Sequence, residues 1–306
     1  MSMSVGKRAS AGLAAAAVVV GLAGCQSGGT GSGGGKAEVL QTRSQALQFI
    51  KDAFTKTADA KSAKVRMTME MPSGSKESGT MRISGVQGWD PAVMDMVVSG
   101  SALTDGAPDA PSQVRMVMVD NVMYMDMGTA QAAAMGGKRW MKLDFKAAAA
   151  ATGNEAMQKQ MSAGLENMNQ DPSQQLALLL ESPNLKHLGS EKVGGVRAEH
   201  YKGTLSFEEM LDANKASSGL TEQQRKTVIA NTKKAGIKGY DTELWVNADH
   251  YPVRMAVGME TSEGTMELRA DYSDYGAAAD VQAPPAKDTV DLFKMLKDMK
   301  PTGVNG

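Results

Sequence analysis

The chain has 306 residues, 42% of them hydrophobic and 22% charged, which is the composition of a folded globular protein. Its 33 basic and 34 acidic residues give a net charge of -1, which argues against a nucleic-acid-binding protein because phosphate binding needs an excess of Lys and Arg. One cysteine and three histidines exclude a disulfide framework, a cysteine-rich zinc site and a haem attachment motif.

The first 25 residues carry the strongest local motif. Lys7 and Arg8 precede an uncharged apolar stretch over residues 11–23, and Leu-Ala-Gly-Cys ends at Cys25. The apolar stretch is shorter than the about 20 residues that a membrane-spanning helix needs. The motif resembles a bacterial lipobox, so we predict a lipoprotein signal peptide over residues 1–24 and a lipidated Cys25. An ordinary cleaved signal peptide with an unmodified cysteine is the alternative.

The segment after Cys25 is rich in glycine and serine and has no apolar side chain over residues 26–35. Such a segment behaves as a flexible coil with a root-mean-square span of roughly 17 to 19 Å. Residues 25–35 are therefore predicted to tether a folded body to the outer face of the cytoplasmic membrane. At least two acyl chains on the cysteine would make that attachment stable.

In the first half of the body, the spacing of apolar residues changes from that of a helix to that of strands. Apolar residues at helical spacing predict a helix over residues 43–59. Strict alternation of apolar and polar residues then predicts six successive strands, which implies an antiparallel meander. These strands are expected over residues 64–71, 79–87, 92–99, 113–119, 122–127 and 138–145.

The second half mixes helices with five more strands. Capping signals at Ser206 and Thr221 mark two of the helix starts. The helices are expected over residues 157–168, 173–181, 207–214 and 221–234, and the strands over residues 185–193, 196–205, 241–247, 252–260 and 265–272.

These elements predict an α+β fold for residues 36–276. It is a single domain in which a large curved antiparallel sheet, an incomplete β-barrel of about eleven strands, packs on several helices. Residues 277–306 are expected to be a linker rich in proline and alanine, followed by a short amphipathic segment over residues 290–299 that docks as a last helix or frays.

Methionine is unusually frequent, with 24 residues against 3 Trp, 6 Tyr and 5 Phe. Aromatic and β-branched residues usually fill a sheet face, whereas methionine is flexible and adapts to differently shaped apolar partners. We therefore predict an apolar, Met-lined cavity for acyl chains, with simple core filling as the alternative. The candidate lipid-binding residues are Met67, Met69, Met81, Ile83, Met94, Met96, Met116, Met118, Met123 and Met125.

Three short segments carry a resemblance to a known family. They are VGGV over residues 193–196, HYKGT over residues 200–204 and ELWVNADHYPVRM over residues 243–255. With the order of elements, residues 40–275 resemble the LolA-like lipoproteins, in particular the actinobacterial LppX and LprG type. The resemblance implies an incomplete β-barrel, open at one mouth, that carries lipid or acylated glycolipid away from the cytoplasmic membrane. It brings no catalytic residues.

Motifs of catalysis are missing from the sequence. There is no G-x-S-x-G, H-E-x-x-H, P-loop or Rossmann glycine motif. His187, His200 and His250 lie on separate predicted elements; we expect His200 to be packed or hydrogen-bonded and His250 to be exposed in a turn. The sequence therefore predicts no enzyme, no metal site and no cofactor.

The predicted function is that of a membrane-anchored, extracytoplasmic lipoprotein that binds lipid or acylated glycolipid and carries or presents it at the cell envelope. The alternative is an envelope sensor or interaction module that binds a lipid or lipoprotein and signals to a membrane-protein partner. No nucleic-acid partner is expected.

Overall fold

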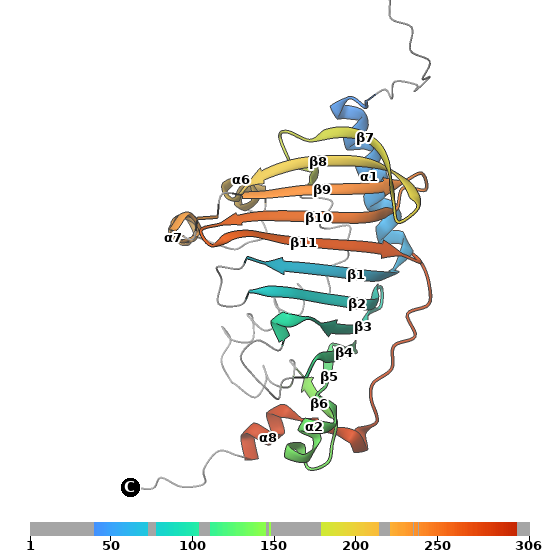
Figure 1. The fold of residues 1–306 in the computed structure, drawn as a ribbon, viewed down its shortest axis with the longest axis vertical. Coiled ribbons are helices and arrows are strands. Elements are labelled where there is room, and N and C mark those ends of the chain that lie inside the picture. The colour runs from blue at the N-terminus through green and yellow to red at the C-terminus, as the bar shows by residue number, and fades with distance from the viewer. Residues whose placement is uncertain are drawn as a thin grey trace, which may run out of the picture. The chain divides into compact units, whose positions relative to one another are not determined.

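The computed structural model describes residues 40–72, 78–103, 111–144, 147, 179–213, 221–234, 236–237 and 239–298. The chain from Glu38 onward forms one compact unit. In it, twelve strands build one open sheet with β12 at one edge and β7 at the other (Figure 1). The strand order is β12-β6-β5-β4-β3-β2-β1-β11-β10-β9-β8-β7.

Both halves of the chain contribute to this sheet, and β1 and β11 join them at its centre. The strands are β1 (Ser62–Met71), β2 (Gly79–Trp89), β3 (Ala92–Ser99), β4 (Gln113–Val119), β5 (Val122–Asp126), β6 (Trp140–Asp144), β7 (Lys186–Val193), β8 (Val196–Ser206), β9 (Gly239–Asn247), β10 (Pro252–Thr261), β11 (Gly264–Ser273) and β12 (Thr289–Asp291). The α-helices are α1 (Arg43–Ala60), α2 (Gly128–Ala132), α6 (Phe207–Ala213), α7 (Glu222–Lys234) and α8 (Leu292–Asp298).

The eleven strands predicted from the sequence are all present, and the α+β fold class is confirmed. The twelfth strand, β12, was not expected. It begins the segment predicted as a helix over residues 290–299 and pairs with β6 in parallel, the one parallel pair of an otherwise antiparallel sheet. Pairing satisfies backbone groups that the edge of β6 would otherwise expose. The helices expected over residues 157–168 and 173–181 lie outside the described residues, apart from a helical end at Leu179 and Leu180.

Helix α1 begins and ends at specific local signals. Thr42 forms a capping box with Gln45, in which the Gln45 N–H donates to Thr42 Oγ1 and the Thr42 N–H donates to Gln45 Oε1. The helix ends where Lys61 adopts a left-handed conformation at φ 64°. These two signals set the length of the helix that covers the sheet.

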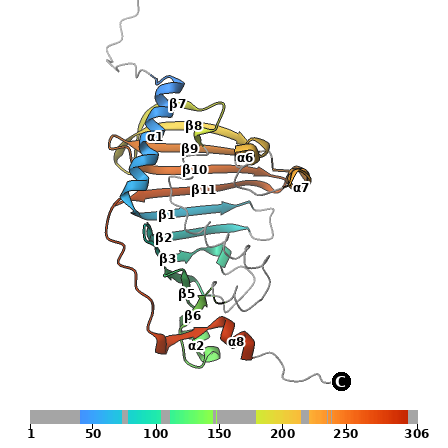
Figure 2. The same ribbon diagram turned by 180° about the vertical axis from the view of Figure 1, so that it is seen from behind.

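One stripe of α1 is completely buried. Ala46, Ile50, Ala53 and Thr57 recur at helical spacing, and each is 0% exposed. Figure 2 shows α1 lying across β7 to β11. The core beneath the helix includes Tyr201, Leu244, Val246, Met255, Ala270 and Tyr272.

A second segment covers the same side of the sheet. The side chains of Leu179 and Ser182 pack over Gly203 of β8, where an added Cβ would lie 2.8 Å from Leu179 Cδ1 and 2.7 Å from Ser182 Oγ. No larger residue fits at Gly203 without displacing this segment. The absence of a side chain there lets residues 179–185 lie close to the strand.

We expect Ile50→Ala to destabilise the protein by about 2 to 5 kcal/mol, because it leaves a cavity between α1 and the sheet. Urea denaturation measures the change in the free energy of unfolding. Lys51→Ala, at an exposed position of the same helix turn, should change it by less than about 0.5 kcal/mol. A loss for Ile50→Ala no larger than that of the control would contradict this packing.

Candidate functional site

The sheet register decides which face each methionine occupies. Residues directly opposite each other in an antiparallel pair point to the same face, as do residues two apart on one strand. Met67 lies opposite Ile83, and Met69 lies opposite Met81. These four candidate residues of β1 and β2 therefore share one face.

The remaining candidates continue the same face. Ile83 lies opposite Val98 of β3, so Met94 and Met96 share the face of Ile83. From there, two rows of opposed residues cross β3 to β6: Met96, Met116, Met125 and Met141 in one, and Met94, Met118, Met123 and Leu143 in the other. The structure thus brings all ten predicted residues onto one side of the sheet.

We call this side of the sheet the inner face; it is the side that α1 covers. Buried residues Ile50, Val65 and Met96 belong to one hydrophobic cluster, against which Met67 and Ile83 pack. All methionines of the strands lie on this face, and none lies on the opposite, outer face. They are Met67, Met69, Met71, Met81, Met94, Met96, Met116, Met118, Met123, Met125, Met141, Met255, Met259 and Met266.

The inner face is also free of charge over most of the sheet. None of the inner-facing residues of strands β1 to β6 and β9 to β11 is Asp, Glu, Lys or Arg. The charged and polar residues of these strands alternate onto the outer face. Chemically, the inner face can contact apolar surface, and these strands supply no ionic partner for a charged group.

The depth of burial divides these methionines into two groups. Met96, Met118, Met123 and Met255 are buried, at 4%, 2%, 7% and 5% exposure. The other ten are only partly buried. The inner face therefore combines four buried methionines with ten whose side chains remain partly accessible to solvent.

A polar network fastens the start of α1 to the sheet edge. His187 of β7 has a side chain only 2% exposed, and its Nδ1 accepts a hydrogen bond from the Gln41 backbone N–H at 2.9 Å. The ring proton is therefore on Nε2, which donates to Glu199 at 2.6 Å. Tyr201 donates its hydroxyl to Gln41 Oε1 at 3.0 Å. Burial raises the pKa of Tyr201, so its hydroxyl keeps this proton.

No sequence pattern predicts this network, because its four residues lie on three separate segments, the residues before α1, β7 and β8, that only the fold brings together. His200 is packed and hydrogen-bonded: its ring stacks on Trp245 at 4.2 Å and its Nε2 lies 2.8 Å from Glu243. His250, expected to be exposed in its turn, is partly buried instead, because its ring packs 4.3 Å from that of Phe49.

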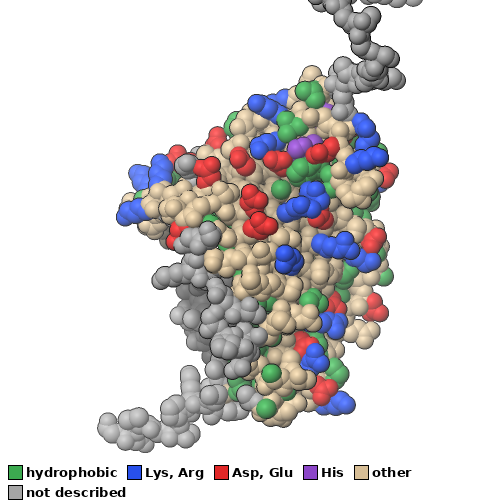
Figure 3. All heavy atoms as spheres, in the orientation of Figure 1, with side chains coloured by type: hydrophobic (Ala, Val, Ile, Leu, Met, Phe, Trp, Pro, Cys, Tyr) green, Lys and Arg blue, Asp and Glu red, His purple; other side chains and the backbone are tan. Residues whose placement is uncertain are grey.

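The outer face carries both acidic and basic side chains (Figure 3), and several of them form ion pairs. Glu243 lies 2.9 Å from Lys202, and Arg254 lies 2.6 Å from Asp271. Burial alone would raise the pKa of Glu243, but hydrogen bonds from Lys202 and His200 outweigh burial and lower it. Glu243 therefore stays ionised and accepts hydrogen bonds from Lys202 and His200.

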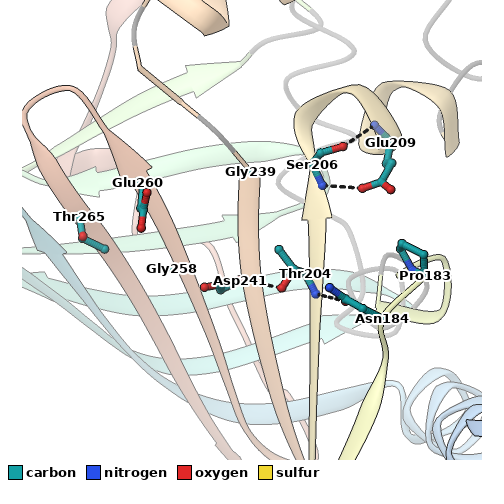
Figure 4. Close-up of a pocket in the computed structure, with 10 residues that line it drawn as sticks. All are labelled: Pro183, Asn184, Thr204, Ser206, Glu209, Gly239, Asp241, Gly258, Glu260 and Thr265. Atoms are coloured by element: carbon teal, nitrogen blue, oxygen red, sulfur yellow. Dashed lines mark hydrogen bonds between the residues drawn. The ribbon is translucent and has the colours of Figure 1, made fainter.

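Two shallow hollows, of about 390 and 510 Å³, open on the outer face. The first is lined by polar groups that already bond one another (Figure 4). In it, Glu209 caps the helix start at Ser206, and Thr204 donates to Asp241 at 2.9 Å. Neither hollow is lined by any of the ten candidate residues.

Other site types find no support in the part of the chain that the structure describes. Its side chains include no group of three or more His, Cys, Asp or Glu residues that could hold a metal ion. Among its helices, none combines the length and apolar character needed to cross a membrane. Cys25 lies outside the described residues.

The ion pair of Asp126 and Arg139 connects β5 to the start of β6, the strands that end the methionine rows. Burial raises the pKa of Asp126, but hydrogen bonds from Arg139, at 2.5 Å, and from the Gly128 N–H outweigh burial and lower it. A carboxylate whose pKa is lowered by folding stabilises the fold at pH values above its pKa in the unfolded chain, which is about 3.9. This stabilisation is lost as the pH falls through the pKa of the folded state.

We therefore expect Arg139→Ala to raise the pKa of Asp126 and to lower stability at neutral pH, with the difference from the wild type disappearing in acid. Urea unfolding at a series of pH values measures this. Arg269→Ala, whose partner Asp271 lies at 3.4 Å on the surface, should have a smaller effect. A loss for Arg139→Ala that does not depend on pH would contradict the assignment.

Comparison with known proteins adds two bacterial relatives and several solved structures. The chain is 25% identical to "Putative lipoprotein SCO4650" of Streptomyces coelicolor, over 78% of this chain and 73% of that protein. Among solved structures it is similar to the Mycobacterium tuberculosis lipoprotein LppX (TM-score 0.44, 10% identity) and to LprF of Mycobacterium bovis (TM-score 0.40, 15% identity). Each match covers 79% of this chain, with 100% of LppX and 97% of LprF. No protein-family model matches the chain.

The other relative is the uncharacterized 31.2 kDa protein of the rplA-rplJ intergenic region of Streptomyces griseus. It is 31% identical over 265 residues, which are 84% of this chain and 82% of that protein. At this identity and coverage, the chain belongs to the same family as the Streptomyces griseus protein.

Proposed function

We propose that this protein is a membrane-anchored, extracytoplasmic lipoprotein that binds lipid or acylated glycolipid against its inner face and carries or presents it at the cell envelope. The observation that carries the proposal is the inner face itself. Fourteen methionines lie on this side of the sheet. None of the residues that β1 to β6 and β9 to β11 place on the same side is charged. Such a surface fits acyl chains of different shape.

Energetics favour exchange of lipid rather than irreversible capture. Burying an acyl chain of about sixteen carbons contributes on the order of 12 kcal/mol, at ~0.8 kcal/mol per CH₂. A bilayer offers the same burial, so transfer between bilayer and protein is close to balanced. Selection then depends on chain shape and on contacts of the headgroup at the rim of the inner face.

The proposed location rests on the lipobox motif at Cys25 and on the relative from Streptomyces coelicolor, which is named as a lipoprotein. A lipid anchor followed by a Gly- and Ser-rich tether would keep the inner face close to the membrane surface. Catalysis is not part of the proposal, because the inner-facing residues of these strands supply no nucleophile with a neighbouring general base.

The direct test is mass spectrometry of lipid extracted from residues 36–306, purified without detergent from an actinobacterial host. The compact unit that begins at Glu38 supports the use of this fragment. We expect a defined lipid at a near-equal molar ratio. A folded, lipid-free protein that co-purifies with one membrane protein would instead favour a sensor or interaction module.

The pair Met69 and Met81 tests the role of the inner face. We expect Met69→Gln with Met81→Gln to reduce bound lipid at least about ten-fold, because two amides of similar length would face acyl chains without hydrogen-bond partners. Met69→Leu with Met81→Leu is the matched control and should retain lipid. Equal retention by the folded Gln and Leu variants would place the lipid elsewhere.

For the anchor, we expect Cys25→Ser to move the protein from the membrane fraction to the soluble or secreted fraction, because no acyl chain can then be attached. Cell fractionation and the intact mass of the mature chain measure this. Ser27→Ala, in the tether, is the control and should remain in the membrane fraction. Membrane retention of a Cys25→Ser variant cleaved at the same site would contradict lipidation.

A further inference from the structure

The strand methionines are confined to the inner face, and the need to fill this face with apolar side chains does not by itself explain why they are methionines. Leucine or isoleucine would bury similar apolar area and fits a sheet at least as well. What methionine adds is a polarizable thioether that oxidants of the peroxide class convert to a sulfoxide, which turns an apolar side chain into a polar one. The inner face is therefore a surface whose polarity can be changed by chemistry.

Burial indicates which of these thioethers an oxidant reaches. Met96, Met118, Met123 and Met255 are buried beneath their neighbours, whereas the other ten are partly exposed. Oxidation of methionine follows exposure. Two pairs of partly exposed methionines lie near the C-terminal ends of β1 and β10 and the N-terminal ends of β2 and β11. They are Met69 opposite Met81, and Met259 opposite Met266.

The cross-strand neighbours of Met69 cannot donate a hydrogen bond to a sulfoxide oxygen. Met69 is flanked across the sheet by Met81 on one side and Leu268 on the other, and neither side chain is a hydrogen-bond donor. A sulfoxide oxygen at Met69 would have to take its hydrogen bonds from water. Water and an acyl chain cannot occupy the same surface, so each sulfoxide disfavours the bound chain.

We propose that the partly exposed methionines of the inner face are a modification site for peroxide-class oxidants, and that their oxidation releases the bound apolar ligand. In each event the thioether sulfur gains one oxygen atom from hydrogen peroxide and is oxidised to the sulfoxide, while the peroxide is reduced to water. The buried methionines remain reduced and the sheet stays folded. This inference rests on the proposed function, because it requires a ligand on the inner face.

The test uses residues 36–306 loaded with a fluorescent sixteen-carbon fatty acid. Hydrogen peroxide is added, sulfoxides are located by peptide mass spectrometry, and bound probe and far-ultraviolet circular dichroism are recorded. We expect sulfoxides at Met69, Met81, Met259 and Met266 before Met96 or Met118, and about ten-fold less bound probe, with the dichroism spectrum unchanged. Absence of probe binding before treatment would count against the proposed function itself.

The matched control replaces Met69, Met81, Met259 and Met266 by leucine. Bound probe is expressed for each protein relative to its own value before treatment, and the leucine variant should keep most of that value afterwards. Undiminished probe binding by wild-type protein that carries these sulfoxides would overturn the inference. It would be overturned equally by a leucine variant that loses as much probe as the wild type, or by unfolding that accompanies the loss.

Discussion

The structure depends on one constraint: an open sheet whose inner face carries no charge over nine of its strands has to keep that face out of water. Helix α1 meets part of this requirement by burying Ala46, Ile50 and Ala53 against β-strand residues such as Val65 and Tyr272. The segment at Leu179 meets another part over β8. Several methionines on the inner face of these strands stay only partly buried, and this remaining apolar surface is where we propose that a ligand binds.

The outer face of the sheet contacts water, and its two edge strands could pair with other chains. Charges on the outer face form ladders across strands, as Lys202 and Glu243 or Arg254 and Asp271 do. At one edge, β7 carries exposed lysines and an irregular register after His187; at the other, the three residues of β12 cover β6. Short, bulged or charged edges discourage pairing with other chains. Paired charges on the outer face and short, bulged or charged edges therefore discourage pairing of this sheet with other chains.

The eleven longer strands could be predicted because their apolar residues alternate with a period of two. Helix α1 could be predicted from apolar residues at helical spacing, and α6 and α7 because Ser206 and Thr221 have capping partners within three residues. Sequence reasoning missed β12, whose three residues are too short to show a period and become a strand only through pairing with β6. It also missed the network of Gln41, His187, Glu199 and Tyr201, whose members are separated along the chain by up to 160 residues. Local patterns do not encode such contacts.

The sequence by itself determined the α+β fold class and the excess of methionine on the strands, and it predicted a lipobox and a tether ahead of the folded body. It could not determine which way those methionines point relative to one another, because alternation along one strand leaves the register between strands open, and a shift of one residue moves every side chain to the other face. Only the tertiary structure decided that, by pairing Met96 with Met116 and Met116 with Met125. The register between neighbouring strands therefore places methionines that are far apart in the sequence on one face of the sheet.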